Sequence, residues 1–148
     1  MASSRLTPVG RERSRPLTLV DSCVPLDLMT DDPTWADWSE SELARVQDEG
    51  PVVINPSVYA EVSAALSAIE ELDEVLPAEA FGREPLPYEA GFLAGKAFLQ
   101  YRRRGGQKTA PLPDFYIGAH AAVRGHRLLT RDATRYRTYF PIVSLICP

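Results

Sequence analysis

The 148-residue chain is long enough to bury a hydrophobic core and is most simply one domain. Its residues are 45% hydrophobic and 24% charged, which is ordinary for a globular protein. No apolar run approaches the roughly 20 residues that a membrane span needs, and the N-terminus lacks the apolar segment of a secretory signal. We therefore expect a cytoplasmic protein that makes no contact with a membrane.

The two cysteines give little information about function. Cys23 and Cys147 do not have the spacing of metal ligands. We expect buried, reduced thiols, as is usual in the cytoplasm, with a disulfide as the less favoured alternative.

Charge is distributed unevenly along the chain, although the formal net charge is only −4. Residues 21–89 contain 17 acids and two bases, whereas residues 96–137 contain ten bases and only two acids. The first sixteen residues add four arginines and one glutamate. The basic part predicts a face that binds a polyanion. Solvated helix faces that happen to segregate by charge are the alternative.

Short apolar, β-favouring runs predict strands that are buried on both faces of a parallel sheet. The expected strands are residues 17–20, 51–54, 127–130 and 142–146, and the expected helices are residues 22–29, 31–48, 58–69, 69–76, 88–101, 115–123 and 133–139. This alternation predicts a three-layer α/β/α fold with a central parallel sheet. We place the domain at residues 16–148, after a flexible basic tail at residues 1–15.

Two local features of these helices make specific structural predictions. Asp31 and Asp32 are expected to cap the helix that follows, with Pro33 in its first turn. Gly91 and Gly95 interrupt another helix, where each costs about 1 kcal/mol relative to alanine. That cost predicts a second backbone packed closely against them.

Four acids stand at positions that suggest a shared site. Asp21 follows the first strand, Asp132 follows the third, Asp114 opens a helix, and Glu61 lies near the inner side of another helix. Ligands of parallel α/β sheets bind outside the carboxyl ends of the strands. Helix capping is the alternative role for each aspartate, and a position at the rim of the fold is the alternative for Glu61.

The chemistry of these acids points to a metal and a phosphodiester. Mg²⁺ and Mn²⁺ prefer oxygen ligands, and carboxylates relieve their mutual repulsion by sharing such a cation. Phosphodiester cleavage needs a metal to activate water and to neutralise developing charge, and a basic surround would hold the other phosphates. Asp114 and Asp132 are the only acids in the basic part of the chain.

Four segments of the sequence together resemble one known family. They are LVDSCVPLDLM, INPSVYAEV, LPDFYIGAHAAVRGHRLLTRD and RYRTYFP, and the resemblance that they carry covers the chain from about Leu17 to the C-terminus. In this order they resemble the PIN-domain ribonucleases, specifically the VapC-type toxins of VapBC toxin–antitoxin pairs. The resemblance implies a PIN-like α/β/α fold.

The resemblance also implies roles for individual residues. Asp21 and Asp114 match aspartates that bind the metal, and Asp132 matches one that binds a metal or orients the nucleophilic water. Glu61 matches the glutamate that completes the acidic pocket, and we count it with the three aspartates as a catalytic and metal-binding residue. Ser22 and Thr130 match small hydroxyl residues that organise the pocket by hydrogen bonds, with local backbone capping as the alternative. Cys23 departs from the commonest pattern, which leaves the metal set unchanged but puts the local hydrogen bonding in doubt.

The activity that the resemblance implies is endoribonucleolytic cleavage, dependent on Mg²⁺ or Mn²⁺, that leaves a 5′-phosphate and a 3′-hydroxyl. It further implies a homodimer and a cognate VapB-type antitoxin that blocks the acidic pocket and alone contacts operator DNA. The alternative is a catalytically inactive PIN-like binding module that acts through its antitoxin.

Basic and aromatic residues complete the set of candidates. The residues expected to contact RNA are Arg102, Arg103, Arg104, Lys108, Arg131 and Arg135. A solvated loop is the alternative for those between 102 and 108. His120 and His126 have no nucleophile signature nearby, so we assign them no catalytic role. Tyr136 is expected to belong to the core rather than to stack on bases.

Overall fold

The sheet lies at the centre of the molecule, in a computed structural model that describes residues 16–148. The predicted tail at residues 1–15 lies outside the described residues. All pairings in the sheet are parallel, in the order β3-β2-β1-β4-β5. The strands are β1 (Thr18–Val20), β2 (Val52–Ile54), β3 (Gly82–Arg83), β4 (Arg127–Leu129) and β5 (Leu145–Ile146).

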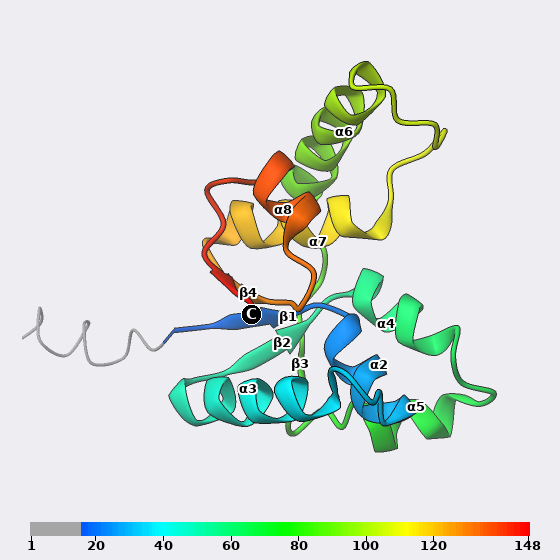
Figure 1. The fold of residues 1–148 in the computed structure, drawn as a ribbon, viewed down its shortest axis with the longest axis vertical. Helices are drawn as coiled ribbons and strands as arrows, with labels where there is room; N and C mark the ends of the chain where they lie inside the picture. Colours follow the sequence, from blue (N-terminus) through cyan, green and yellow to red (C-terminus); the bar gives the residue numbers. More distant parts are fainter. Residues whose placement is uncertain (1–15) are drawn as a thin grey trace, which may run out of the picture.

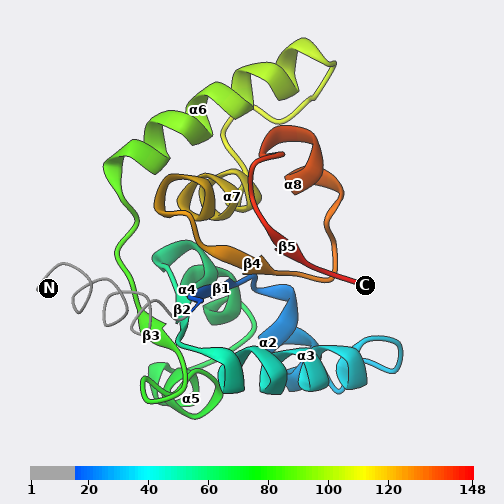
Figure 2. The same ribbon diagram turned by 90° about the vertical axis from the view of Figure 1, so that its left-hand side faces the viewer.

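Helices cover both faces of the sheet (Figure 1). They are α2 (Cys23–Thr30), α3 (Ala36–Glu49), α4 (Pro56–Ser63), α5 (Ile69–Val75), α6 (Tyr88–Arg103), α7 (Pro113–Arg124) and α8 (Thr134–Tyr139). Figure 2 shows α2, α3 and α5 on one side of the sheet and α6, α7 and α8 on the other. The three-layer α/β/α prediction is therefore confirmed. Within the described residues, no helix is both long enough and apolar enough to cross a membrane.

The central strand β1 explains why the apolar runs predicted strands correctly. Leu19 and Val20 are fully buried, and β1 is paired on both sides, with Thr18 opposite Val52 of β2 and Arg127 of β4. The chain proceeds outward from β1 through β2 to β3, and then returns to place β4 on the other side of β1. The carboxyl ends of β1 and β4 thus meet at a topological switch point, where open α/β sheets bind ligands.

Helix α3 begins later than predicted. Asp31 adopts a left-handed conformation, with φ of 48°, and ends α2 instead of opening α3. The Oδ1 atom of Asp32 accepts hydrogen bonds from the backbone nitrogens of Thr34 (2.8 Å) and Trp35 (2.9 Å). These bonds form a turn before the helix, so Pro33 lies in that turn and α3 begins at Ala36.

Other boundaries were also misplaced. The helix expected through Ile69 ends at Ser63, and Ile69 is 65% exposed at the start of α5. Strand β3 was missed because it has only two residues, Gly82 and Arg83, and no apolar run. Strand β5 is limited to Leu145–Ile146. Cys23 and Cys147 are free thiols as expected, although both are only partly buried.

The close packing predicted at Gly91 and Gly95 is wrong for the described residues. A Cβ atom built at either glycine would meet nothing within 4 Å. The tight contact in the helical layer is instead at Gly118 of α7, where a Cβ would lie 2.4 Å from Cδ2 of Phe140. Phe140 is 2% exposed, so its ring has little room to move away.

Two glycine-to-alanine substitutions test this assignment. Gly118→Ala should lower the free energy of unfolding by about 1–3 kcal/mol, because the added methyl overpacks the core against Phe140. Gly91→Ala should instead raise it by about 0.5–1 kcal/mol, because alanine favours an exposed helix and meets no neighbour. Urea unfolding of both variants measures the difference. Equal effects of the two substitutions would contradict the packing described here.

Candidate functional site

Four structural elements bring the predicted acids toward the switch point. Asp21 directly follows β1, and Asp132 lies three residues after the end of β4. Asp114 is the second residue of α7, and Glu61 lies in α4. Figure 1 shows that α7 and α4 both begin beyond the carboxyl end of β1.

Asp21 is the most buried of the four acids, with 4% of its surface exposed. Its Oδ1 accepts a hydrogen bond from the backbone nitrogen of Ser22 at 2.8 Å. Its Oδ2 accepts two more, from the hydroxyls of Thr130 (2.8 Å) and Tyr136 (2.9 Å). Burial raises the pKa of Asp21 to about 6. The three hydrogen bonds oppose that rise, and the charge of Asp114 adds to it.

The other acids are linked to Asp21 by hydrogen bonds and by repulsion. The hydroxyl of Ser22 donates to Oε1 of Glu61 at 2.9 Å. Burial raises the pKa of Glu61, and the charges of Asp21 and Asp114 raise it further. Burial also raises the pKa of Asp114, and the charge of Asp132 adds to the effect. Each acid therefore lies within electrostatic reach of another, and the set resists full ionisation.

Arg135 offsets part of this negative charge. Nη1 of Arg135 lies 3.2 Å from Oδ2 of Asp114, and this ion pair opposes the rise in the pKa of Asp114. The guanidinium also lies over the rings of Tyr101 (5.8 Å) and Phe115 (5.7 Å), contacts that favour a fixed cation. Beside it is a surface pocket of about 470 Å³, whose lining includes Tyr101, Asp114, Asp132 and Arg135.

The four carboxylates offer hard oxygen donors, which suit Mg²⁺ or Mn²⁺. These four acids do not form a closed cage. No three of them bring carboxylate oxygens within 4.8 Å of one another, whereas one other group of three described residues brings its ligand atoms that close. Mg²⁺ keeps several of its waters and binds proteins through one or two carboxylates. The spread of these acids is therefore compatible with a hydrated cation.

The remaining predicted site residues lie in different surroundings. Nε of Arg131 donates to Oδ2 of the buried Asp27 at 2.8 Å, and its guanidinium covers the ring of Trp35. Arg102 lies in the last turn of α6 and donates to the backbone oxygen of Lys108 at 2.9 Å. The structure thus brings only Arg135 of the six basic candidates into an ion pair with a predicted acid. Contact of RNA with any of the six stays a prediction.

Tyr136 is a site residue that the sequence analysis assigned only to the core. It is 1% exposed, yet its hydroxyl reaches Asp21. Burial strongly raises the pKa of this hydroxyl, so it stays protonated and acts as a donor. The sequence did offer one indication of this contact: a tyrosine predicted to lie in the core has a hydroxyl that needs a hydrogen-bond partner.

The fold and the position of the acids define a class of protein. The chain is a three-layer α/β protein with an acidic site at the switch point of a parallel sheet. The family model of the PIN domain matches residues 18–141, and the chain therefore belongs to the PIN domain family. No curated protein is significantly similar to the chain in sequence.

Solved structures of low sequence identity share the fold. VapBC2 from Rickettsia felis, bound to a promoter DNA fragment, matches with a TM-score of 0.68 at 14% identity, over 89% of this chain and 98% of that chain. VapBC-1 from nontypeable Haemophilus influenzae has a TM-score of 0.66 at 15% identity, over 88% and 97%. FitAcB from Neisseria gonorrhoeae has a TM-score of 0.63 at 18% identity, over 87% and 96%.

The raised pKa of Asp21 predicts how stability depends on its charge. The rise from 3.8 to about 6 makes the ionised, folded state less favourable by about 3 kcal/mol above pH 6. Asp21→Asn removes this penalty, although the amide cannot replace every hydrogen bond of the carboxylate. The variant should therefore be at least as stable as the parent protein at pH 7.5 without divalent metal.

The difference in stability between Asp21→Asn and the parent protein should depend on pH. Below pH 3.8, Asp21 is protonated in both the folded and the unfolded chain, so the relative advantage of Asp21→Asn should disappear there. Thermal unfolding from pH 3.5 to 8 measures it, with Asp73→Asn on the exposed side of α5 as the matched control. A variant that is clearly less stable than the parent protein at neutral pH would contradict the prediction.

Proposed function

We propose that this protein is a metal-dependent endoribonuclease and the toxin of a type II toxin–antitoxin pair. The observation that carries the proposal is the hydrogen-bonded, mutually repelling set of acids at the switch point of a PIN domain. Separate elements hold these acids, and all four coincide with the positions that the sequence motifs single out. The substrate is RNA, and the protein acts in the cytoplasm.

The acids divide the work of holding the metal. Asp21, Asp114 and Asp132 bind Mg²⁺ or Mn²⁺, and Glu61 completes the pocket. When bound, the ion lowers the pKa of a water and neutralises charge that develops on the scissile phosphate. The hydroxyls of Thr130 and Tyr136 and the backbone of Ser22 orient the Asp21 carboxylate and favour its charged form. The Ser22 hydroxyl orients Glu61 in the same way.

Arg135 is the basic residue best placed to act at the scissile bond. Its guanidinium is held beside Asp114 by two aromatic rings, at the edge of the 470 Å³ pocket. A guanidinium matches the geometry of a phosphate and hydrogen-bonds to two of its oxygens. Arg102, Arg103, Arg104, Lys108 and Arg131 hold the RNA backbone further from the cleaved bond.

The partners follow from the same proposal. The solved structures that share the fold include VapBC assemblies, one of them bound to promoter DNA. We propose a VapB-type antitoxin that covers the acidic pocket, a toxin homodimer within the hetero-oligomer, and contact with operator DNA through the antitoxin only. The second candidate function, an inactive PIN-like module acting through its antitoxin, lacks a specific observation in its favour.

Substitution of the acids tests the proposed reaction. Asp21→Asn, Asp114→Asn and Asp132→Asn should each lower the rate of RNA cleavage at least about 100-fold, because a lost ligand costs more than a residue that merely supports one. EDTA should abolish cleavage, and Mg²⁺ or Mn²⁺ should restore it. The readout is the size of labelled RNA fragments, together with their 5′-phosphate and 3′-hydroxyl ends.

An acid outside the site supplies the control. Asp73→Ala, on the exposed side of α5, should cleave as fast as the parent protein. Circular dichroism of each variant checks that the fold is kept. Undiminished cleavage by all three site variants would overturn the proposal. Calorimetric titration that finds no binding at millimolar Mn²⁺ would favour the inactive module instead.

A further inference from the structure

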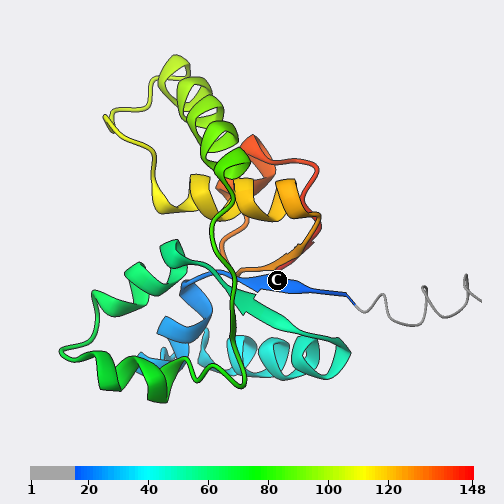
Figure 3. The same ribbon diagram turned by 180° about the vertical axis from the view of Figure 1, so that it is seen from behind.

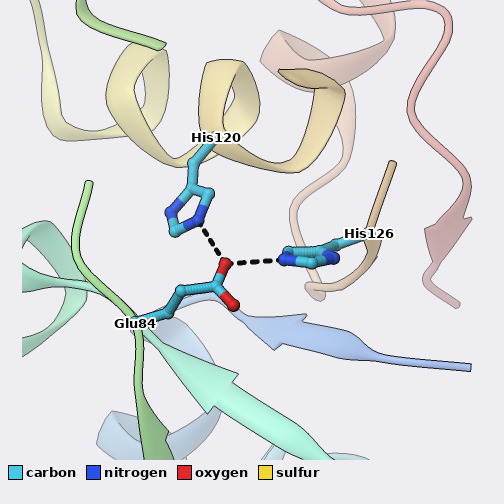
Figure 4. Close-up of side chains that lie close together, drawn as sticks. All are labelled: Glu84, His120 and His126. Carbon is cyan, nitrogen blue, oxygen red and sulfur yellow. Dashed lines mark hydrogen bonds and ion pairs between the residues drawn. The ribbon is translucent and has the colours of Figure 1, made fainter. Parts of the chain in front are cut away.

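A second cluster of chemically active side chains lies outside the acidic site (Figure 4). Oε1 of Glu84 lies 2.7 Å from Nε2 of His120 and 2.6 Å from Nε2 of His126. Glu84 follows β3, His120 lies in α7, and His126 directly precedes β4. Figure 3 shows the segment between β3 and α6 passing from one helical layer to the other. The chain has only two histidines, and the cluster contains both.

We propose that Glu84, His120 and His126 form a binding site for a divalent transition-metal ion of the zinc type. Two imidazoles and one carboxylate suit Zn²⁺ and related ions, and differ from the all-oxygen set that Mg²⁺ prefers. The three ligand atoms lie within 4.8 Å of one another. Small rotations of the side chains would therefore place an ion about 2.0–2.2 Å from each ligand atom.

The site is accessible on one side and enclosed on the other. The side chains of Glu84 and His126 are 26% and 11% exposed, whereas His120 is fully buried. A surface pocket of about 430 Å³ is lined in part by Glu84 and Asn55. An ion can thus reach the cluster from solvent, and a water can complete its coordination.

Asn55 determines where His120 carries its proton in the metal-free protein. Oδ1 of Asn55 accepts a hydrogen bond from the backbone nitrogen of Val58, at the start of α4, at 3.0 Å. Its Nδ2 must therefore be the atom that donates to Nδ1 of His120, also at 3.0 Å. The imidazole proton then lies on Nε2 and is donated to Glu84. Without a metal, hydrogen bonds alone join Asn55, Glu84 and the two histidines.

Metal binding requires that proton to move. Nε2 of His120 can ligate an ion only through its free electron pair, so the neutral ring must carry its proton on Nδ1. There it faces the NH₂ group of Asn55, a second donor. To relieve this clash, the Asn55 amide must turn away from its hydrogen bond to the backbone nitrogen of Val58, so α4 loses its cap. The cost of the lost cap weakens metal binding by about tenfold relative to a site without this clash. Nδ1 of His126 has no hydrogen-bond partner among the described residues, so its proton can move freely.

This mismatch provides a substitution that should improve the site. In Asn55→Asp, one carboxylate oxygen can still cap α4 through Val58, because aspartate is as good an N-cap as asparagine. The other oxygen can accept the Nδ1 proton of His120, which gives the carboxylate–histidine–metal arrangement common in zinc sites. Asn55→Asp should therefore bind zinc at least about tenfold more tightly than the parent protein.

The experiment is a zinc titration of the full chain at pH 7.5 against a chromogenic chelator, with Co²⁺ absorption as a probe of nitrogen ligands. We expect one zinc equivalent at micromolar concentration or below, and a rise in Tm on binding. His126→Ala and Glu84→Gln should each weaken binding by about 100-fold or more. Both positions are partly exposed, which limits damage to the fold.

A variant of the acidic site separates the two metal sites. Asp114→Asn should bind zinc as tightly as the parent protein, since Asp114 does not belong to the cluster. Zinc binding that is lost in Asp114→Asn but kept in His126→Ala would assign the ion to the acidic site and overturn the inference. So would the absence of zinc binding at micromolar concentration, or binding by Asn55→Asp that is no tighter than in the parent protein. The proposed function is tested separately, by RNA cleavage.

Discussion

The burial of one negative charge, on Asp21 at the end of the central strand, is the constraint on which the site depends. A buried carboxylate is costly unless donors surround it. Three donors do so here, from Ser22, Thr130 and Tyr136, which belong to segments following β1 and β4 and to helix α8. Even so, burial keeps the pKa of Asp21 near 6. The protein therefore holds an anion in a position that a cation would relieve, and part of its folding free energy is spent on this arrangement.

The parallel sheet makes this arrangement geometrically simple. Because β1 and β4 are neighbours and run in the same direction, the residues that follow them emerge at one edge. Helix α7 runs back over the sheet toward β4, so its first turn brings Asp114 to that edge. Arg135 then supplies a positive charge that pairs with Asp114, and aromatic rings rather than further acids hold its guanidinium in place.

Features governed by local patterns were predictable, and features governed by distant contacts were not. Apolar runs located β1, β2 and β4, and the acids beside them followed from the rule for parallel sheets. The two-residue strand β3 has no pattern of its own, because pairing with β2 defines it. Likewise, Glu84 meets His120 through a hydrogen bond between residues 36 positions apart in sequence. No spacing rule connects such positions.

The pairing of Asn55 with a following proline has a consequence for the chemical ageing of the protein. Asparagine residues commonly lose their amide when the backbone nitrogen of the next residue attacks the side chain and closes a five-membered ring. Pro56, the first residue of α4, has no N–H and cannot close that ring. The same proline that starts the helix therefore protects the amide that sets the proton position of His120. The fastest chemical route from asparagine to aspartate is therefore closed at position 55.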